Sequence, residues 1–508
     1  MTGIIAVAGL VIFTVLVSAW NHREGRKWKR ARVLSSFGQK PEEGERPSEQ
    51  TRILWEKTKT ENGLDDITWS DLDLDDVFVR VNTCCSWVGE QVLYKSMRDM
   101  DAEPDRLAAL EEDITWLDQN EKERQELQLR LFDLGKKENS CYVPELITEP
   151  EIFELEHPWV YRVLQALLTA SLLGGLGAAI FFRNMEMLSP FLFLFLVNMC
   201  VYALKKNSYE INLEIISAVQ ALTSLAGNLA ESDKICGGHF REKFRGTKEA
   251  AAKLNKTLRV LRKRQQSQYS TDLSVCAASL RRSLPLFCVP EYSGRRELEL
   301  KDLYNPLIDE PVYNDLSLKT GCIITGSNAS GKSTFIKAAA ISAVLAASVH
   351  TCAASRARLY PFDVYTSIAI RDDLLAGESY FIKEIRSMER IIRKVDEGRP
   401  VLAVIDEILR GTNTKERIAA STAVLQYLRE KGCLVIAATH DLEIAENLVS
   451  GPAGYEGFYF CEEAYEQGLA FDYKIHSGIC HQTNAVRLLE VFGFPEEITR
   501  EARRSLEE

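Results

Sequence analysis

The stretch from Gly321 to Ala340, GCIITGSNASGKSTFIKAAA, constrains the fold more than any other part of the chain. An apolar strand leads into a glycine-bracketed loop, and a helix-forming run follows at once. The loop meets the pattern G-x-x-x-x-G-K-[ST], in which backbone N–H groups close on phosphate oxygens at the amino terminus of a helix. We therefore expect an ATP site, with Lys332 on the outer phosphates and Ser333 on Mg²⁺. The candidate nucleotide-binding residues of this loop are Gly326, Ser327, Asn328, Ala329, Ser330, Gly331, Lys332, Ser333 and Thr334.

Two further apolar runs predict strands that end in polar side chains. Residues 401–405 (VLAVI) are followed by Asp406 and Glu407, and residues 434–438 (LVIAA) by Thr439 and His440. Acids at strand ends are common in any α/β sheet. Beside a phosphate-binding loop, however, Asp406 is expected to hold Mg²⁺ and Glu407 to polarise the attacking water. His440 falls at the same carboxyl edge, where it would sense the terminal phosphate or orient that water.

Length and charge limit the remaining possibilities. A chain of 508 residues is long enough for more than one domain. Its net charge of -11 excludes a protein that binds polyanions through its overall field, so any nucleic-acid contact must be local. The twelve cysteines include no C-x-x-C pair, which favours free thiols in a reducing compartment.

Three apolar segments have the length of membrane spans: residues 4–20, 163–182 and 187–204. The first is followed by a basic run, residues 21–32, and the other two form a tight hairpin that closes with Lys205 and Lys206. Positive flanks favour the cytoplasmic side, so we expect an external amino terminus and cytoplasmic residues 21–160 and 205 onward. The alternatives are a cleaved signal peptide for the first segment and a buried core hairpin for the others.

The remaining patterns divide the chain. Leu107, Leu110 and Ile114 mark one helical face after Pro104, and Gly135 is expected to end a later helix. A basic segment, residues 234–264, is either a solvated helix face or a phosphate-binding surface. The expected divisions are a transmembrane anchor (1–21), a basic juxtamembrane segment and linker (22–52), a helical core and lever-like region (53–158), a transmembrane hairpin (159–205), a returning helical stalk (206–300), an ATPase domain (301–476) and a helix-turn-helix dimerisation tail (477–508).

Four stretches in fixed succession carry a family resemblance: GSNASGKST, RDDLLAGESYF, VIDEILRGTNTKER and AATHDLE. Together they resemble the ATPase domain of the MutS family of DNA mismatch repair proteins, from about Asn305 to the end of the chain. The tail from Tyr473 to Arg503 resembles the helix-turn-helix with which family members clasp a partner's ATPase domain. Weaker similarity covers Leu72 to Met97, which resembles the start of the family's helical core.

The resemblance implies a fold class and a set of roles. The implied fold is an α/β P-loop NTPase domain of the ABC/MutS type plus an α-helical lever and core domain, and the apolar segments described above add three transmembrane helices to the expected fold. Lys332 and Ser333 would contact phosphate and Mg²⁺, Asp406 would hold Mg²⁺, Glu407 would be the catalytic base and His440 the switch. Ser379 would reach the nucleotide of the opposite subunit, so the resemblance implies a homodimer that encloses two ATP molecules.

The expected function is that of a membrane-anchored MutS-like ATPase in the cytoplasmic membrane, with DNA as a possible partner. Too few residues precede the ATPase region for the amino-terminal domain that reads mispairs, so mismatch reading is not expected. A transport-type ATPase is the first alternative, although no LSGGQ-like segment is present. A nucleotide-switched membrane scaffold that recruits a protein partner is the second, and no partner is indicated by the sequence.

Overall fold

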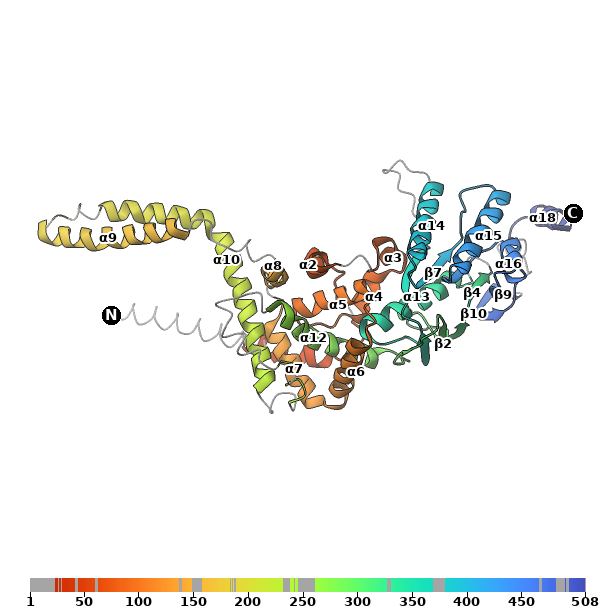
Figure 1. The fold of residues 1–508 in the computed structure, drawn as a ribbon, viewed down its shortest axis with the longest axis horizontal. Helices are drawn as coiled ribbons and strands as arrows, with labels where there is room; N and C mark the ends of the chain where they lie inside the picture. Colours follow the sequence, from red (N-terminus) through yellow and green to blue (C-terminus); the bar gives the residue numbers. More distant parts are fainter. Residues whose placement is uncertain are drawn as a thin grey trace.

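The strand before the glycine-rich loop lies inside a six-stranded sheet in the computed structural model, with the strand order β10-β9-β4-β8-β7-β6 (Figure 1). All neighbours in this sheet are parallel except β9 and β10, which form an antiparallel hairpin. The strands are β4 (Gly321–Thr325), β6 (Asp363–Ser367), β7 (Val401–Asp406), β8 (Leu434–Ala438), β9 (Glu456–Tyr465) and β10 (Gly468–Ser477). The three strands expected from the sequence and the α/β class of this domain are thereby confirmed.

The structure describes most of the chain, and all statements below concern that part. The described residues are 23–25, 27–28, 30–41, 44–59, 63–136, 139–148, 158–182, 184, 186, 189–231, 238–241, 243–244, 261–326, 330–368, 380–465, 468–480, 489 and 493–507.

Helices cover both faces of the large sheet because its central strands are apolar on both sides. On one face, Ile324, Val404 and Ile436 pack against α13 (Lys332–Val349), the helix that follows the glycine-rich loop. On the other face, Ile405 and Val435 belong to a second core with the remaining helices. Those helices are α14 (Tyr380–Asp396), α15 (Thr414–Glu430) and α16 (Leu442–Val449). Continuous burial along β4, β7 and β8 follows from this double covering.

A smaller sheet of four strands, in the order β1-β5-β2-β3, adjoins the large one; three of its strands come before β4 in the chain, and β5 follows α13. Its strands β2 and β3 are antiparallel, and β2 contributes Leu298, Leu300 and Leu303 to the core around α13. The strands are β1 (Glu291–Tyr292), β2 (Leu298–Leu303), β3 (Asn314–Leu318) and β5 (Arg356–Leu359). The region before the glycine-rich loop is therefore part of the same core. Its first strands, β1 and β2, begin before residue 301, where the ATPase domain was expected to start.

The amino-terminal half is helical, as expected. Pro104 begins one helix, and Gly135, at φ 64°, ends the next one, as the sequence predicted. The helices are α2 (Glu49–Thr58), α3 (Asp66–Asp71), α4 (Leu74–Val81), α5 (Trp87–Asp99), α6 (Pro104–Gln119), α7 (Glu121–Leu134), the 3₁₀ turn η1 (Ser140–Tyr142) and α8 (Val143–Thr148). The returning helix α12 (Leu261–Ser283) packs against α5 and α6.

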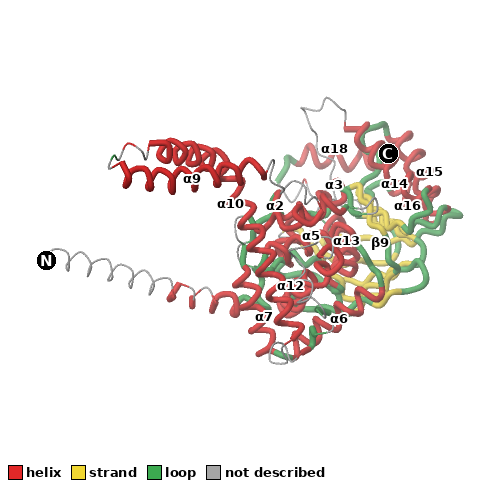
Figure 2. Tube along the Cα trace, turned by 60° about the vertical axis from the view of Figure 1, so that its left-hand side comes forward, coloured by secondary structure: helices red, strands yellow, loops and turns green. Residues whose placement is uncertain are grey.

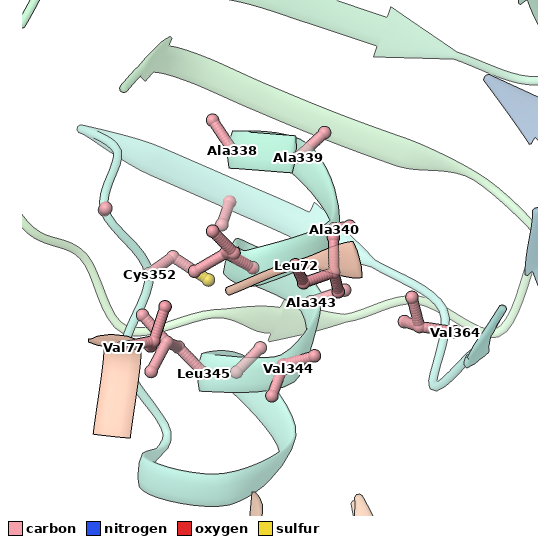
Figure 3. Packing of buried hydrophobic residues seen from close by; sticks show 14 of the residues in the cluster. Leu72, Val77, Ala338, Ala339, Ala340, Ala343, Val344, Leu345, Cys352 and Val364 are labelled. Carbon is pink, nitrogen blue, oxygen red and sulfur yellow. The ribbon is translucent and has the colours of Figure 1, made fainter. Parts of the chain in front are cut away.

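Helix α13 joins the helical and the strand-rich parts into one continuous core. Its residue Ala340 lies beside Leu72 of the helical part, and its residue Leu345 lies beside Val77, as Figure 3 shows. All four side chains are buried, with at most 1% exposed. Because this core is closely packed, a ligand that displaced α13 at its amino terminus would also displace α4 and the helices around it.

The apolar hairpin projects away from this body (Figures 1 and 2). It consists of α9 (Pro158–Phe182) and the first part of α10 (Ser189–Glu231), which then continues without a break along the helical part. Only 6% of the apolar window in Arg162–Phe182 is buried. One other described helix, Lys332–Val349, is also long and apolar enough to cross a membrane, but it is α13 of the core and is 83% buried. The continuous stalk is as expected, whereas the first apolar segment, residues 4–20, lies outside the described residues.

Two further expectations meet the structure in part. Most of the basic segment 234–264 lies outside the described residues, but its Lys243 forms an ion pair with the buried Asp113 at 2.5 Å, so this lysine belongs to the helical body. Of the carboxy-terminal tail, α18 (Glu496–Glu507) is described, and most of the residues expected to form the preceding helix are not.

Candidate active site

The two glycines that bracket the loop, Gly326 and Gly331, have positive φ angles, which a phosphate-binding loop requires at such positions. Gly326 has φ 137°, and a Cβ there would lie 2.5 Å from the carbonyl oxygen of Phe460. Gly331 has φ 99° and stands immediately before the first residue of α13. The buried Lys332 donates a 2.6 Å hydrogen bond to the carbonyl oxygen of Gly326, so its ammonium group reaches across the loop. The expected residues Ser327, Asn328 and Ala329 lie outside the described residues.

Ser333 and Asp406 meet at the carboxyl edge of the sheet. The Ser333 Oγ donates a 2.5 Å hydrogen bond to Asp406 Oδ2. Burial raises the pKa of Asp406, and the hydrogen bond from Ser333 opposes that rise only in part. A hydroxyl and a half-buried carboxylate at this distance are the oxygen ligands that Mg²⁺ prefers, and a divalent cation would offset the cost of ionising Asp406 there. The residues present therefore fit the expected metal.

Glu407 and His440 form a second pair at the same edge. Asp406 and Ala438 are direct neighbours across β7 and β8, so Glu407 and His440 follow the two strands at the same edge, one and two positions beyond this pair. His440 Nδ1 lies 3.4 Å from Glu407 Oε1, and Arg410 Nε lies 2.6 Å from Glu407 Oε2. The hydrogen bond with His440 lowers the pKa of Glu407 and raises that of His440. The structure thus brings Glu407 and His440 together as expected, with Glu407 held as a carboxylate.

The backbone after Glu407 is held by a residue that had no predicted role. Glu384 of α14 is buried and accepts hydrogen bonds from the backbone N–H groups of Arg410 (3.0 Å) and Gly411 (3.1 Å). Glu407 itself has φ 55°, a left-handed conformation that a non-glycine residue adopts only when its surroundings impose it. The Glu384 carboxylate therefore helps to hold the backbone beside Glu407, the candidate catalytic carboxylate.

A cavity of about 410 Å³ opens next to the glycine-rich loop. Gly331, Ser333 and Thr334 line the cavity at the loop, and apolar and aromatic groups from other elements line much of the rest. The latter include Tyr304, Ile308, Val312, Phe460 and Tyr473. This volume lies in the range typical of small-molecule sites. The arrangement suits a nucleotide, with the phosphates at the helix end and the base among the aromatic groups.

Comparison with known proteins agrees with this geometry. Residues 322–508 match the family model of MutS domain V. The domain V match begins inside β4 and contains Lys332, Ser333, Asp406, Glu407 and His440.

Curated relatives that are similar to this chain match less than half of it. The chain is 32% identical over 232 residues to the DNA mismatch repair protein MutS of Pseudothermotoga lettingae, covering 43% of this chain and 28% of that protein. It is 32% identical over 197 residues to that of Thermus thermophilus, covering 38% and 24%. It is 30% identical over 228 residues to that of Aquifex pyrophilus, covering 43% and 26%. The chain thus spans about a quarter of the length of these relatives.

The residues that shape the cavity lie partly before the MutS domain V match. Asn314 of β3 donates a 2.9 Å hydrogen bond to the carbonyl oxygen of Tyr473 and accepts one of 2.9 Å from the N–H of Ile475. These bonds hold a bulge in β10 in which Tyr473 has φ 51°. A Cβ on Gly331 would lie 3.0 Å from the Tyr473 ring, so this ring stands against the loop.

Several residues of this site were not predicted from the sequence. One residue that was predicted, Ser379, lies outside the described part of the chain. It directly precedes α14. Glu384, Arg410, Asn314 and Tyr473 had no predicted role. The clearest available signal was position, because Glu384 closely follows GESYF and Arg410 lies within the DE-x-x-RGT run.

Proposed function

We propose that this chain is a membrane-anchored MutS-like ATPase that binds ATP with Mg²⁺, hydrolyses it as a homodimer and contacts DNA without reading mismatches. The observation that carries the enzymatic part is the placement of two pairs, Ser333 with Asp406 and Glu407 with His440, at one sheet edge beside a nucleotide-sized cavity. The similarity to MutS domain V supports the same reaction.

Binding and hydrolysis follow from the positions of these side chains. Lys332 leaves the Gly326 carbonyl for the outer phosphates, and the Tyr473 ring supports the base. Ser333 and Asp406 would hold Mg²⁺, which would neutralise negative charge on the phosphate oxygens. Glu407 accepts a proton from water as the water oxygen bonds to the terminal phosphorus, and the bond to the bridging oxygen of ADP breaks. His440, hydrogen-bonded to Glu407, keeps that carboxylate oriented and deprotonated.

The homodimer in this proposal is supported by the family resemblance. Members of the family present a serine from the GESYF region to the nucleotide of the opposite subunit, and Ser379 is the matching residue here. Helix α14 begins directly after this segment, and its Glu384 binds the backbone beside Glu407. Closure of two subunits on ATP would therefore act on the catalytic carboxylate through α14.

The membrane part of the proposal rests on the projecting hairpin. Its exposed side chains are large and apolar, among them Leu173, Ile180 and Phe193. Such a surface is favourable in a bilayer and costly in water. Since α10 is one continuous helix of 43 residues that bends where it leaves the hairpin (Figure 1), unbroken helical backbone joins the hairpin to the helical part.

Labelling of Cys200 tests the anchoring. This cysteine is exposed on the apolar part of α10. In inside-out membrane vesicles, a membrane-impermeant maleimide should leave Cys200 unlabelled until the protein is unfolded in detergent and urea, whereas Cys480 of the nucleotide-binding part should react from the start. Equal labelling of Cys200 before and after unfolding would refute insertion of the hairpin.

ATP turnover with a panel of DNA structures tests the rest. The detergent-purified protein should hydrolyse ATP, and one class of branched, mispaired or plain duplex DNA should change its rate at low salt, where phosphate contacts are strongest. Turnover that no DNA alters would remove DNA from the proposal and favour a nucleotide-switched scaffold. Absence of ATP turnover would refute the proposed ATPase activity.

A further inference from the structure

We propose that Cys461, Asp472 and His476 form a binding site for a divalent transition-metal ion of the Zn²⁺ class. Each of these residues offers one ligand atom, and the three atoms all lie within 4.8 Å of one another. Tetrahedral zinc at about 2.0–2.3 Å from its ligands places neighbouring donor atoms roughly 3.5 Å apart. Small side-chain rotations are therefore enough to close this group around an ion.

The bulge in β10 creates the group. Phe471 is paired with Glu462 and Ile475 with Phe460, so the three residues between them, 472–474, stand opposite the single residue Cys461. In a regular strand, the Cα atoms of Asp472 and His476 would lie about 13 Å apart. Here Asp472 Oδ2 lies 3.0 Å from His476 Nε2. The irregularity thus brings two potential ligands of one strand to the third on its neighbour.

Neighbouring contacts hold the ligands in place. The second carboxylate oxygen of Asp472 accepts a 2.9 Å hydrogen bond from the N–H of Lys474, which leaves Oδ2 facing the histidine. The His476 ring stacks on Tyr459 with centroids 5.2 Å apart. Supporting contacts of this kind fix the orientation of metal-binding side chains. An ion would replace the proton shared by Oδ2 and Nε2, and the Cys461 thiol would lose its proton on binding.

The donor set selects the class of ion. A thiolate and an imidazole favour zinc and related transition metals, whereas Mg²⁺ and Ca²⁺ require oxygen ligands. Asp472 is exposed and Cys461 and His476 are half-buried, so an ion has a path from solvent. Three protein ligands leave the fourth position to water.

This group is separate from the proposed Mg²⁺ site, but it shares the β9–β10 hairpin with the nucleotide cavity. Phe460 and Tyr473 line the cavity, and each directly adjoins a proposed ligand, Cys461 and Asp472 respectively. Side chains of successive strand residues point to opposite faces, so the side chains of Phe460 and Cys461 lie on opposite faces of the hairpin. Metal binding would fix the bulge that presents Tyr473.

Cobalt titration of the full, detergent-purified chain tests the site. After chelation and removal of the chelator, Co²⁺ should bind with one equivalent that shows a near-ultraviolet sulfur-to-cobalt charge-transfer band, and Zn²⁺ should displace it. Cys461→Ser should abolish the band, and His476→Gln should weaken binding by at least about tenfold. Cys480→Ser, at a half-buried cysteine outside the group, should leave both unchanged.

The readout does not depend on ATP, so its failure is distinct from failure of the proposed ATPase. A wild-type protein without the charge-transfer band would overturn the metal site. So would a band that survives in Cys461→Ser or is lost equally in Cys480→Ser. If Cys461→Ser does not fold, as judged by circular dichroism, the comparison of His476→Gln with wild type decides the question.

Discussion

Ser333 Oγ and Asp406 Oδ2 are 2.5 Å apart although 73 positions separate the two residues in the sequence. The sheet explains the proximity. β8 lies between β4 and β7, and Ile324, Ala438 and Asp406 form one level row across the three strands. The loop after β4 and the acid at the end of β7 therefore open on the same edge, where open parallel sheets bind their ligands.

Replacement of this hydroxyl tests the Mg²⁺ role. Ser333→Ala removes one predicted metal ligand, and it also removes a hydrogen bond that favours the ionised form of Asp406. We expect turnover to fall by roughly 10²-fold, with a higher Mg²⁺ concentration needed for half-maximal rate. Ser348→Ala, at the far end of the same helix, is the control because its hydroxyl only bonds the carbonyl of Val344. An unchanged Mg²⁺ dependence in Ser333→Ala would refute the assignment.

Titration of His440 tests its pairing with Glu407. The hydrogen bond to Glu407 raises the pKa of His440 above its ordinary value of 6.5. The stabilisation from the charged histidine is therefore complete below pH 6.5 and is lost as the pH rises through the elevated pKa. Nuclear magnetic resonance of labelled histidines, assigned with His440→Gln, should show this elevated pKa in the wild type and a lower one in Glu407→Gln. An identical His440 titration in both proteins would contradict the pairing.

The aromatic ring of Tyr473 should contribute to nucleotide affinity. Tyr473→Ala removes the ring from the cavity wall, and we expect a loss of about 1–3 kcal/mol in ATP binding, the range measured for base stacking on aromatic side chains. Tyr473→Phe should retain most of the affinity. Inorganic triphosphate, which has no base, should bind Tyr473→Ala as well as wild type in competition with a fluorescent nucleotide. Equal weakening for both ligands would point to a damaged loop instead.

Arg281 should stabilise the junction between α12 and the end of α13. It makes two bonds to the Glu111 carboxylate, at 2.8 and 2.6 Å, and donates to Thr351 Oγ1 and the His350 carbonyl. Arg281→Met leaves the partly buried Glu111 with His350 but without its guanidinium partner, so we expect the free energy of unfolding to fall by about 3 kcal/mol. Arg282→Met breaks an exposed ion pair with Asp118 and should cost less than about 1 kcal/mol.

Urea denaturation compares these two variants, and similar losses would contradict the distinction. The pH dependence gives a second check. Burial opposes ionisation of Glu111, but hydrogen bonds from Arg281 and His350 outweigh it and lower the pKa to about 2. Because the pKa is lowered from 4.5, this stabilisation is present above pH 4.5 and is lost as the pH falls towards 2. The difference between wild type and Arg281→Met should shrink over that range.

The chemistry of the sheet edge could be predicted because it follows local patterns. Apolar runs that end in Asp406 or His440 predict strands, and parallel strands share one edge. Glu384 and Asn314 could not be predicted in this way. Each acts by holding backbone from a distant part of the chain, 26 and 159 positions away for the nearest contacts, and no periodicity records such a contact.

The shape of the junction was also beyond sequence reasoning. Helix α13 is as apolar as a membrane span, and only its burial between the sheet and residues such as Leu72 identifies it as core. Conversely, α9 has similar composition and remains exposed. Hydropathy alone does not distinguish a core helix from a membrane span, because it depends on the residues of the helix and not on what surrounds them.

Single-turnover hydrolysis by Glu407→Gln, measured together with ATP binding, is the decisive experiment. The variant keeps Lys332, Ser333, Asp406 and the cavity, so it should bind ATP with Mg²⁺ as tightly as wild type. Loss of the carboxylate that accepts the proton should slow cleavage by about 10²–10⁴-fold. Cleavage at the wild-type rate would contradict the role of Glu407, and failure of the wild type to bind ATP would contradict the nucleotide site itself.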